Sequence, residues 1–179
     1  TMVSFFEGFI NLVKNDKDIG LIIKNKKPEK NRIINKKIEQ LIHETERCHV
    51  INNPFQRMAS SYLRGVNLVV GISIFLPSVI LECAANGTRS IFYDTNNMQD
   101  YESEIFTWAK DKVIFNNLQK MIDKIKGYKD NPDLIPDFGL WNKDKIKLNA
   151  FKDNYGSKRI GKYLKCLVDG FNDNKDANE

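Results

Sequence analysis

The stretch GVNLVVGISIFLPSVILECAANGTRSIFYD, which covers residues 65–94, decides the fold class. Its apolar runs predict a buried strand over 66–71 and a second one over 89–93. Between them, residues 77–86 are typical of an apolar helix that ends at Gly87. Because two strands joined by a crossover helix run in the same direction, this stretch predicts a parallel sheet.

The same alternation of strands and helices continues on both sides of this stretch. Further strands are expected over 19–24, 48–51 and 112–115, and further helices over 3–14, 33–42, 53–62, 117–127 and 157–171. The predicted fold class is therefore α/β, a Rossmann-like parallel sheet with helices on both faces. We expect one domain over residues 1–171 and a polar tail over 172–179. Because the pattern opens on a helix, where such folds open on a strand, the chain is interpreted as a fragment without its N-terminal domain.

Composition excludes several classes of protein. The chain has 179 residues, of which 41% are hydrophobic, and is long enough to bury a core. Its net charge is +5, but the lysines alternate with acidic residues, so no nucleic-acid partner is expected. The three cysteines lack the spacing of a zinc site, so no metal is expected. They are far apart and odd in number, which argues against a disulfide framework and favours the cytoplasm. Cys83 and Cys166 fall in apolar helical patterns and are expected in the core.

Glu82 is the one charged residue between Arg64 and Arg89. Burying an isolated carboxylate is costly unless a partner donates hydrogen bonds to it. Glu82 is therefore expected either to bind a ligand or to pair with an arginine, for which Arg57, Arg64 and Arg89 are the candidates.

Polar groups collect where the predicted strands end, and this is the edge at which parallel sheets bind ligands. The start of the 77–86 helix favours an anion, and a carboxylate one turn later suits the two hydroxyls of a ribose. A nucleoside diphosphate would satisfy both. The candidate binding residues are Gly71, Ser73, Ser78 and Glu82, with Lys24, Lys26 and Lys27 as positive charges. Asp94 and the polar residues 95–97 follow the next strand at the same edge. The alternative is that the lysines are solvated and that the serines only cap a helix.

Three segments resemble the donor-binding half of GT-B fold glycosyltransferases, particularly those of bacterial surface-polysaccharide synthesis. They are VNLVVGISIFLPSVILECAANGTRSIFYD, the strand end IIKNKKP and the closing GSKRIGKYLKCLVDGF, which resembles a C-terminal helix that crosses back toward the other domain. The resemblance implies that Glu82 binds the donor ribose, that Gly71, Ser73 and Ser78 line the phosphates, and that Lys24 with Lys26 or Lys27 balances their charge. Position 74 is Ile, where retaining members carry the first of two glutamates.

The resemblance also implies a function. The chain would bind a nucleotide-sugar donor, such as a UDP-sugar, for transfer of the sugar to a surface-polysaccharide acceptor. It would need no cofactor and would be inactive without an N-terminal acceptor domain, and the complete enzyme could associate peripherally with a membrane. No catalytic residue is assigned. Two alternatives stay open: half of a nucleotide-sugar epimerase, and a non-catalytic binding or scaffold module.

Overall fold

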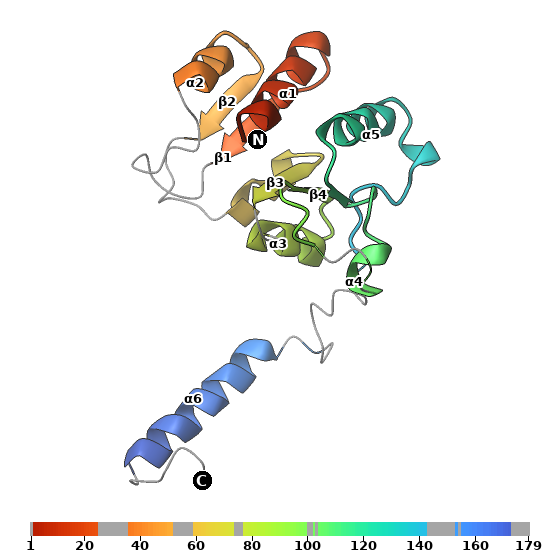
Figure 1. The fold of residues 1–179 in the computed structure, drawn as a ribbon. Helices are drawn as coiled ribbons and strands as arrows, with labels where there is room; N and C mark the ends of the chain where they lie inside the picture. Colours follow the sequence, from red (N-terminus) through yellow and green to blue (C-terminus); the bar gives the residue numbers. More distant parts are fainter. Residues whose placement is uncertain are drawn as a thin grey trace. The chain divides into compact units, whose positions relative to one another are not determined.

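A computed structural model describes residues 2–24, 36–51, 59–73, 77–99, 102, 104–142, 153 and 155–172 (Figure 1). The chain divides into two compact units, residues 1–146 and 147–179, which are described separately here. The predicted single domain over 1–171 stays a prediction.

All strand pairs described in the first unit are parallel. β1 (Leu21–Lys24) pairs with β2 (Cys48–Ile51). β4 (Ser90–Asp94) lies between β3 (Val69–Ser73) and β5 (Ile114–Phe115). These pairings confirm an α/β protein with parallel strands, although hydrogen bonds join the described strands into two small sheets.

Helices cover both faces of the β3–β4–β5 sheet. On one face lie α1 (Met2–Asn15) and α5 (Leu118–Asp130), and the Phe5 ring of α1 stacks on Tyr93 of β4 with centroids 5.6 Å apart. On the other face lies α3 (Ser78–Asn86), as Figure 1 shows. It packs on β3, where Gly71 lies against Ile80. The alternation of side chains along each strand explains this two-sided packing.

Among the described residues, one hydrophobic core cluster joins the two sheets of the first unit. It includes Ile23 of β1, Phe9 of α1 and Ile91 of β4. The helix α2 (Lys36–His43) adds Ile38 to this core. The apolar spacing of α1 and α2 therefore produces the buried face that the sequence predicts.

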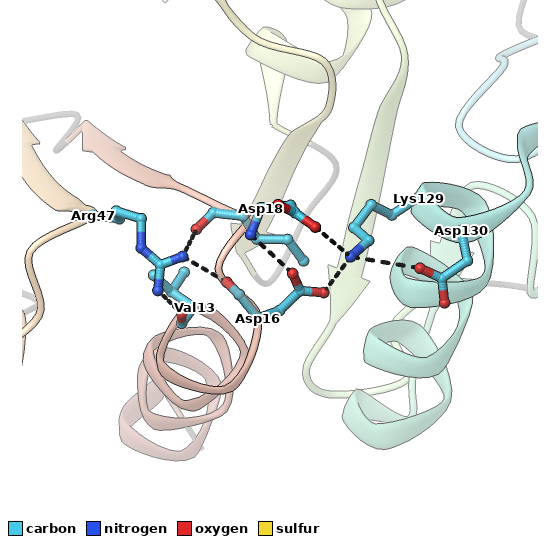
Figure 2. A network of polar contacts seen from close by, with 7 residues as sticks. Val13, Asp16, Asp18, Arg47, Lys129 and Asp130 are labelled. Carbon is cyan, nitrogen blue, oxygen red and sulfur yellow. Dashed lines mark hydrogen bonds and ion pairs between the residues drawn. The ribbon is translucent and has the colours of Figure 1, made fainter.

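Polar side chains hold the end of α1 in place, as Figure 2 shows. The Arg47 guanidinium, which comes just before β2, donates to the carbonyl oxygens of Val13 at 2.6 Å and Asp16 at 2.7 Å. On the opposite side, Lys129 of α5 donates to the Asp16 carboxylate at 2.7 Å. The last carbonyls of a helix have no partner within the helix, and Arg47 supplies one.

The amino edge of the β3–β4–β5 sheet is covered by the segment after the short 3₁₀ helix η3 (Pro132–Leu134). The Ser90 amide donates to the Gly139 carbonyl at 2.8 Å, and the Trp141 Nε1 donates to the Ser90 carbonyl at 2.9 Å. Gly139 has a φ of 72°, and a Cβ there would meet Arg89 Cβ at 3.1 Å. Residues 136–141 therefore fill the space at this edge.

Several elements differ from the prediction. α5 continues three residues past Gly127, because Tyr128 packs on Phe138 with ring centroids 5.4 Å apart. α4 (Glu104–Thr107) was not predicted. The predicted 53–62 helix falls partly outside the described residues, and its described part belongs to the 3₁₀ helix η2 (Ala59–Gly65).

The second unit contains α6 (Gly156–Asn172), which confirms the predicted final helix within one residue at each end. Cys166 is exposed on α6, so its expected place in the core is wrong. The reason is that no residue of α6 is buried within the described part of the chain. Among the described helices, none combines the length and the apolar character needed to cross a bilayer.

Candidate functional site

The carboxyl edge of the β3–β4–β5 sheet carries the main part of the predicted site. β3 ends at Ser73 and β4 ends at Asp94, and these two residues are partners in the strand register. The two strands therefore end at the same level of the sheet. The side chain of Ser73 lies outside the described part of the structure, as do residues 74–76.

The start of α3 lies close to β3 because Gly71 has no side chain. A Cβ at Gly71 would lie 2.9 Å from Pro77 Cγ and 2.9 Å from Ile80 Cγ1. Gly71 is itself buried beneath the helix, so its role is to allow close packing of α3. Gly71 thereby sets the position of the helix start, and its predicted place beside the phosphates stays a prediction.

The N-cap position of α3 is Pro77, which has no polar side-chain atom and makes no side-chain cap hydrogen bond. The amide of Ile80 donates to the Pro77 carbonyl at 3.0 Å. A side-chain acceptor from the cap residue is thus missing at a helix end that carries partial positive charge. Backbone amides at this position can donate to an anion.

Ser78 and Glu82 lie one turn apart on α3, so they share a side of the helix. Ser78 is exposed and Glu82 is partly exposed. The expectation that Glu82 is a buried charge is wrong, since the buried residues of α3 are Ile80, Cys83 and Ala84. The carboxylate stands on a side of the helix that the sheet does not cover.

Arg89 does not provide the structural partner that was considered for Glu82. Its guanidinium donates to the carbonyl oxygen of Pro136 at 2.9 Å and to that of Phe138. It also lies 4.8 Å from the ring centroid of Tyr128. Arg89 thus stabilises the 136–141 segment at the amino edge of the sheet. Of the other two candidates, Arg57 lies outside the described residues, and Arg64 is exposed at the end of the 3₁₀ helix η2.

Of the three candidate lysines, the structure describes Lys24 alone. Lys24 is the last residue of β1 and is partly exposed. It lies at the carboxyl end of the β1–β2 sheet, whereas Ser78 and Glu82 belong to the helix after β3. Lys26 and Lys27 lie outside the described residues. Their predicted contact with phosphate stays a prediction.

Asp94 has a role that the sequence analysis missed. Its side chain is 1% exposed, and it accepts hydrogen bonds from the backbone amides of Met98 and Gln99, each at 3.1 Å. Asn97 adopts a left-handed φ of 52° within this turn. Asp94 therefore organises the 95–99 loop. An Asp directly after a strand and followed by Thr and Asn is a signal for such a turn.

The remaining chemistry of the described residues is limited. They contain no cluster of three His, Cys, Asp or Glu side chains that could hold a metal ion. Burial raises the pKa of the Cys83 thiol to about 11, so Cys83 is a core residue and a poor nucleophile. With a metal cluster and a cysteine nucleophile set aside for the described residues, the start of α3 with Ser78 and Glu82 is the candidate site.

No protein family, curated protein or solved structure was found to match the chain. The class of protein that the fold defines is thus an α/β protein with small parallel sheets.

Proposed function

We propose that this chain is the donor-binding domain of a glycosyltransferase and binds the nucleoside diphosphate of a sugar donor at the start of α3. In this proposal the parallel strands belong to a Rossmann-like sheet, one half of a GT-B fold. The whole enzyme transfers the sugar to a surface-polysaccharide acceptor on the cytoplasmic side of the cell.

The observation that carries the proposal is the close contact between β3 and α3. Gly71 lets Pro77 and Ile80 approach to a distance at which any Cβ would clash. The helix start is thereby held at the carboxyl edge of the sheet. Close strand–helix packing at a glycine followed by an open helix N-terminus is a general solution for binding phosphates.

The amino edge of the same sheet supports this choice of edge. Hydrogen bonds from Ser90 to Gly139 and from Trp141 to Ser90 close that end of β4. A ligand that approached there would have to displace the 136–141 segment. The carboxyl edge is also where parallel sheets bind their ligands in general.

In the proposed complex, the first amides of α3 and the hydroxyl of Ser78 donate to the phosphates. Glu82 lies one turn further, at a Cβ–Cβ distance of roughly 5–6 Å from Ser78. Its two carboxylate oxygens accept hydrogen bonds from the ribose hydroxyls. Ser73 and the lysines Lys24, Lys26 and Lys27 complete the set of candidate donors to the diphosphate.

The contribution to catalysis would be electrostatic. The partial positive charge at the start of α3 stabilises the diphosphate as it leaves the sugar. The acceptor and the base belong to the N-terminal domain that we propose as partner, so the chain by itself is inactive. An epimerase that acts on nucleotide sugars would use the same donor site, and only its partner domain would differ.

A melting scan of the chain with nucleoside diphosphates and their sugars tests this proposal. UDP, CDP, GDP and TDP are added one at a time. A ligand present at 100 times its dissociation constant stabilises the folded state by about 2.7 kcal/mol. For a chain of this size that corresponds to a rise in melting temperature of roughly 5–10 °C. No shift with any of these nucleoside diphosphates or their sugars would contradict nucleotide binding and favour a scaffold module.

Glu82→Gln tests the ribose assignment, and Glu46→Gln is its matched control. Both residues are glutamates that are at least partly exposed, and Glu46 lies in the turn between α2 and β2. We expect the glutamine at position 82 to reduce affinity for the nucleoside diphosphate about tenfold and that at position 46 to leave it unchanged. Inorganic pyrophosphate should bind both variants equally, because it has no ribose. Equal loss with pyrophosphate would place Glu82 near the phosphates instead.

A further inference from the structure

The apolar face of α6 is exposed along its whole length. Within the described residues, no side chain of α6 is buried. The stripe consists of six side chains that recur at intervals of three and four and are between 49% and 82% exposed: Ile160, Tyr163, Leu164, Leu167, Val168 and Phe171. Exposed apolar stripes of this size mark sites of interaction.

The opposite face of α6 is basic. Lys158, Lys162 and Lys165 follow one another at intervals of four and three, on the side away from the apolar stripe. With Arg159 and the single acidic residue, Asp169, the helix has four basic groups and one acid, a net charge of +3. The whole chain has a net charge of +5. The helix thus concentrates positive charge beside a continuous apolar surface.

Ion pairs account for part of this charge. Arg159 donates two hydrogen bonds to Asp153, at 2.7 and 3.0 Å, and Lys165 lies 2.7 Å from Asp169. Lys158 and Lys162 project from the same face without belonging to these pairs. Residues 173–179 carry three acids and one lysine, which places negative charge after the far end of the helix. The cationic part of α6 is therefore its first two-thirds.

We propose that α6 is a surface-binding helix that lies flat on an anionic membrane. The 17-residue helix is about 25 Å long, and its polar face prevents it from spanning a bilayer. A basic face opposite Leu, Ile, Tyr and Phe side chains is the composition of helices that bury their apolar side at the headgroup boundary. Each lysine near such a surface is attracted by anionic lipids.

Charge also favours a lipid surface over a second copy of the helix. A pair of α6 helices would bring together two bodies that each have a net charge of +3, whereas an anionic lipid surface carries the complementary charge. The inference does not depend on nucleotide binding at α3, because it uses residues of the second unit alone.

Sedimentation of the full chain with lipid vesicles tests the proposal. One set of vesicles contains phosphatidylcholine alone, and a second set contains phosphatidylcholine with phosphatidylglycerol. We expect binding to the anionic vesicles that is at least about tenfold stronger than binding to the neutral ones and that falls as salt rises.

Two pairs of variants separate α6 from the rest of the chain. Leu164→Glu should weaken binding to the vesicles at least about tenfold. Leu134→Glu is its control, because Leu134 of η3 is also an exposed apolar residue, at 76%, and its replacement should leave binding unchanged. Lys162→Glu should weaken binding to anionic vesicles, whereas Lys126→Glu on α5 makes the same change in net charge and should have a smaller effect. An unchanged melting temperature shows that each variant is folded.

Three outcomes would overturn the proposal. The first is no sedimentation with either kind of vesicle, and the second is equal binding to both. The third is a concentration-dependent dimer in the absence of lipid that Leu164→Glu dissociates, because the apolar stripe would then be covered by a second copy of the chain.

Discussion

The Nη2 atom of Arg47 lies 2.6 Å from the carbonyl oxygen of Val13, 34 positions earlier in the chain (Figure 2). The other terminal nitrogen, Nη1, donates to the carbonyl of Asp16. One side chain thus joins the approach to β2 to the last turn of α1. The contact orients α1, whose phenylalanines fill the core above β4.

Replacing Arg47 by Met should therefore destabilise the first unit by about 2–3 kcal/mol, since hydrogen bonds from a charged donor are lost and the helix carbonyls keep no partner. Urea unfolding, followed by circular dichroism, measures the change. Arg64→Met is the matched control: Arg64 is exposed at the end of η2, and its replacement should change stability by less than about 0.5 kcal/mol. Equal effects of the two substitutions would contradict the capping role.

The ion pair between Asp16 and Lys129 predicts a dependence of stability on pH. The hydrogen bond from Lys129 holds the pKa of Asp16 below its usual value, and the same bond raises the pKa of Lys129. A lowered carboxylate pKa stabilises the fold above the unfolded pKa, and this contribution is lost as the pH falls below about 4. A raised lysine pKa stabilises the fold below about pH 10.4, and this contribution is lost above it.

Asp16→Asn should therefore reduce the free energy of unfolding most between about pH 5 and 9, and the difference from the unmodified chain should shrink toward both extremes. Urea unfolding at a series of pH values measures it. Asp18→Asn is the control, because Asp18 is 3.5 Å from Lys129 and its side chain is 81% exposed. A difference for Asp16→Asn that does not change with pH would contradict the ion pair as its cause.

The sequence predicted the parallel strands because short apolar runs alternate with helical patterns. The end of α3 was also predictable, since Gly87 adopts a φ of 74° that favours glycine. The exact limits of β3 were not. The strand was expected over 66–71 and lies at Val69–Ser73. Its limits are set by pairing with β4, and the composition of one strand carries no information about the register of that pairing.

The candidate site was predictable in part. Ser78 and Glu82 fall on one side of a helix at the carboxyl edge of a parallel sheet, as their spacing indicates. That Glu82 is partly exposed was not predictable, because an apolar sequence does not tell which side of a nine-residue helix the sheet covers. The contacts of Arg47 with α1 were also beyond prediction, since they join residues far apart in the chain.

The three cysteines should differ in reactivity. Cys166 is exposed on α6, Cys48 is partly buried and Cys83 is fully buried. Burial raises the pKa of Cys48, and it raises that of Cys83 to about 11, so little thiolate exists at neutral pH. With iodoacetamide at pH 7.5, we expect Cys166 to react first and Cys83 only in urea, as measured by mass spectrometry of tryptic peptides. Rapid modification of Cys83 in the folded chain would contradict its place on the buried side of α3.

Gly71 should be intolerant of any side chain. In Gly71→Ala the new methyl group would lie 2.9 Å from both Pro77 and Ile80, so α3 must shift away from β3. We expect a loss of about 1–3 kcal/mol in urea unfolding. In Gly65→Ala, by contrast, the new methyl group meets nothing within 4 Å, and stability should change little. If the chain binds a nucleoside diphosphate, Gly71→Ala should also weaken that binding, because it moves the helix start.

Asp94 should matter for stability and for the shape of the carboxyl edge. Asp94→Ala removes a buried carboxylate and leaves the amides of Met98 and Gln99 without their acceptor, at a cost of about 3 kcal/mol. Asp94→Asn keeps one acceptor oxygen and should cost less. Urea unfolding measures both losses, and hydrogen exchange of the Met98 and Gln99 amides should accelerate in the alanine variant before global unfolding.

Asp133→Ala, at an exposed aspartate of η3, is the control and should change stability by less than about 0.5 kcal/mol. Unchanged exchange at Met98 and Gln99 would show that the loop holds its shape without Asp94.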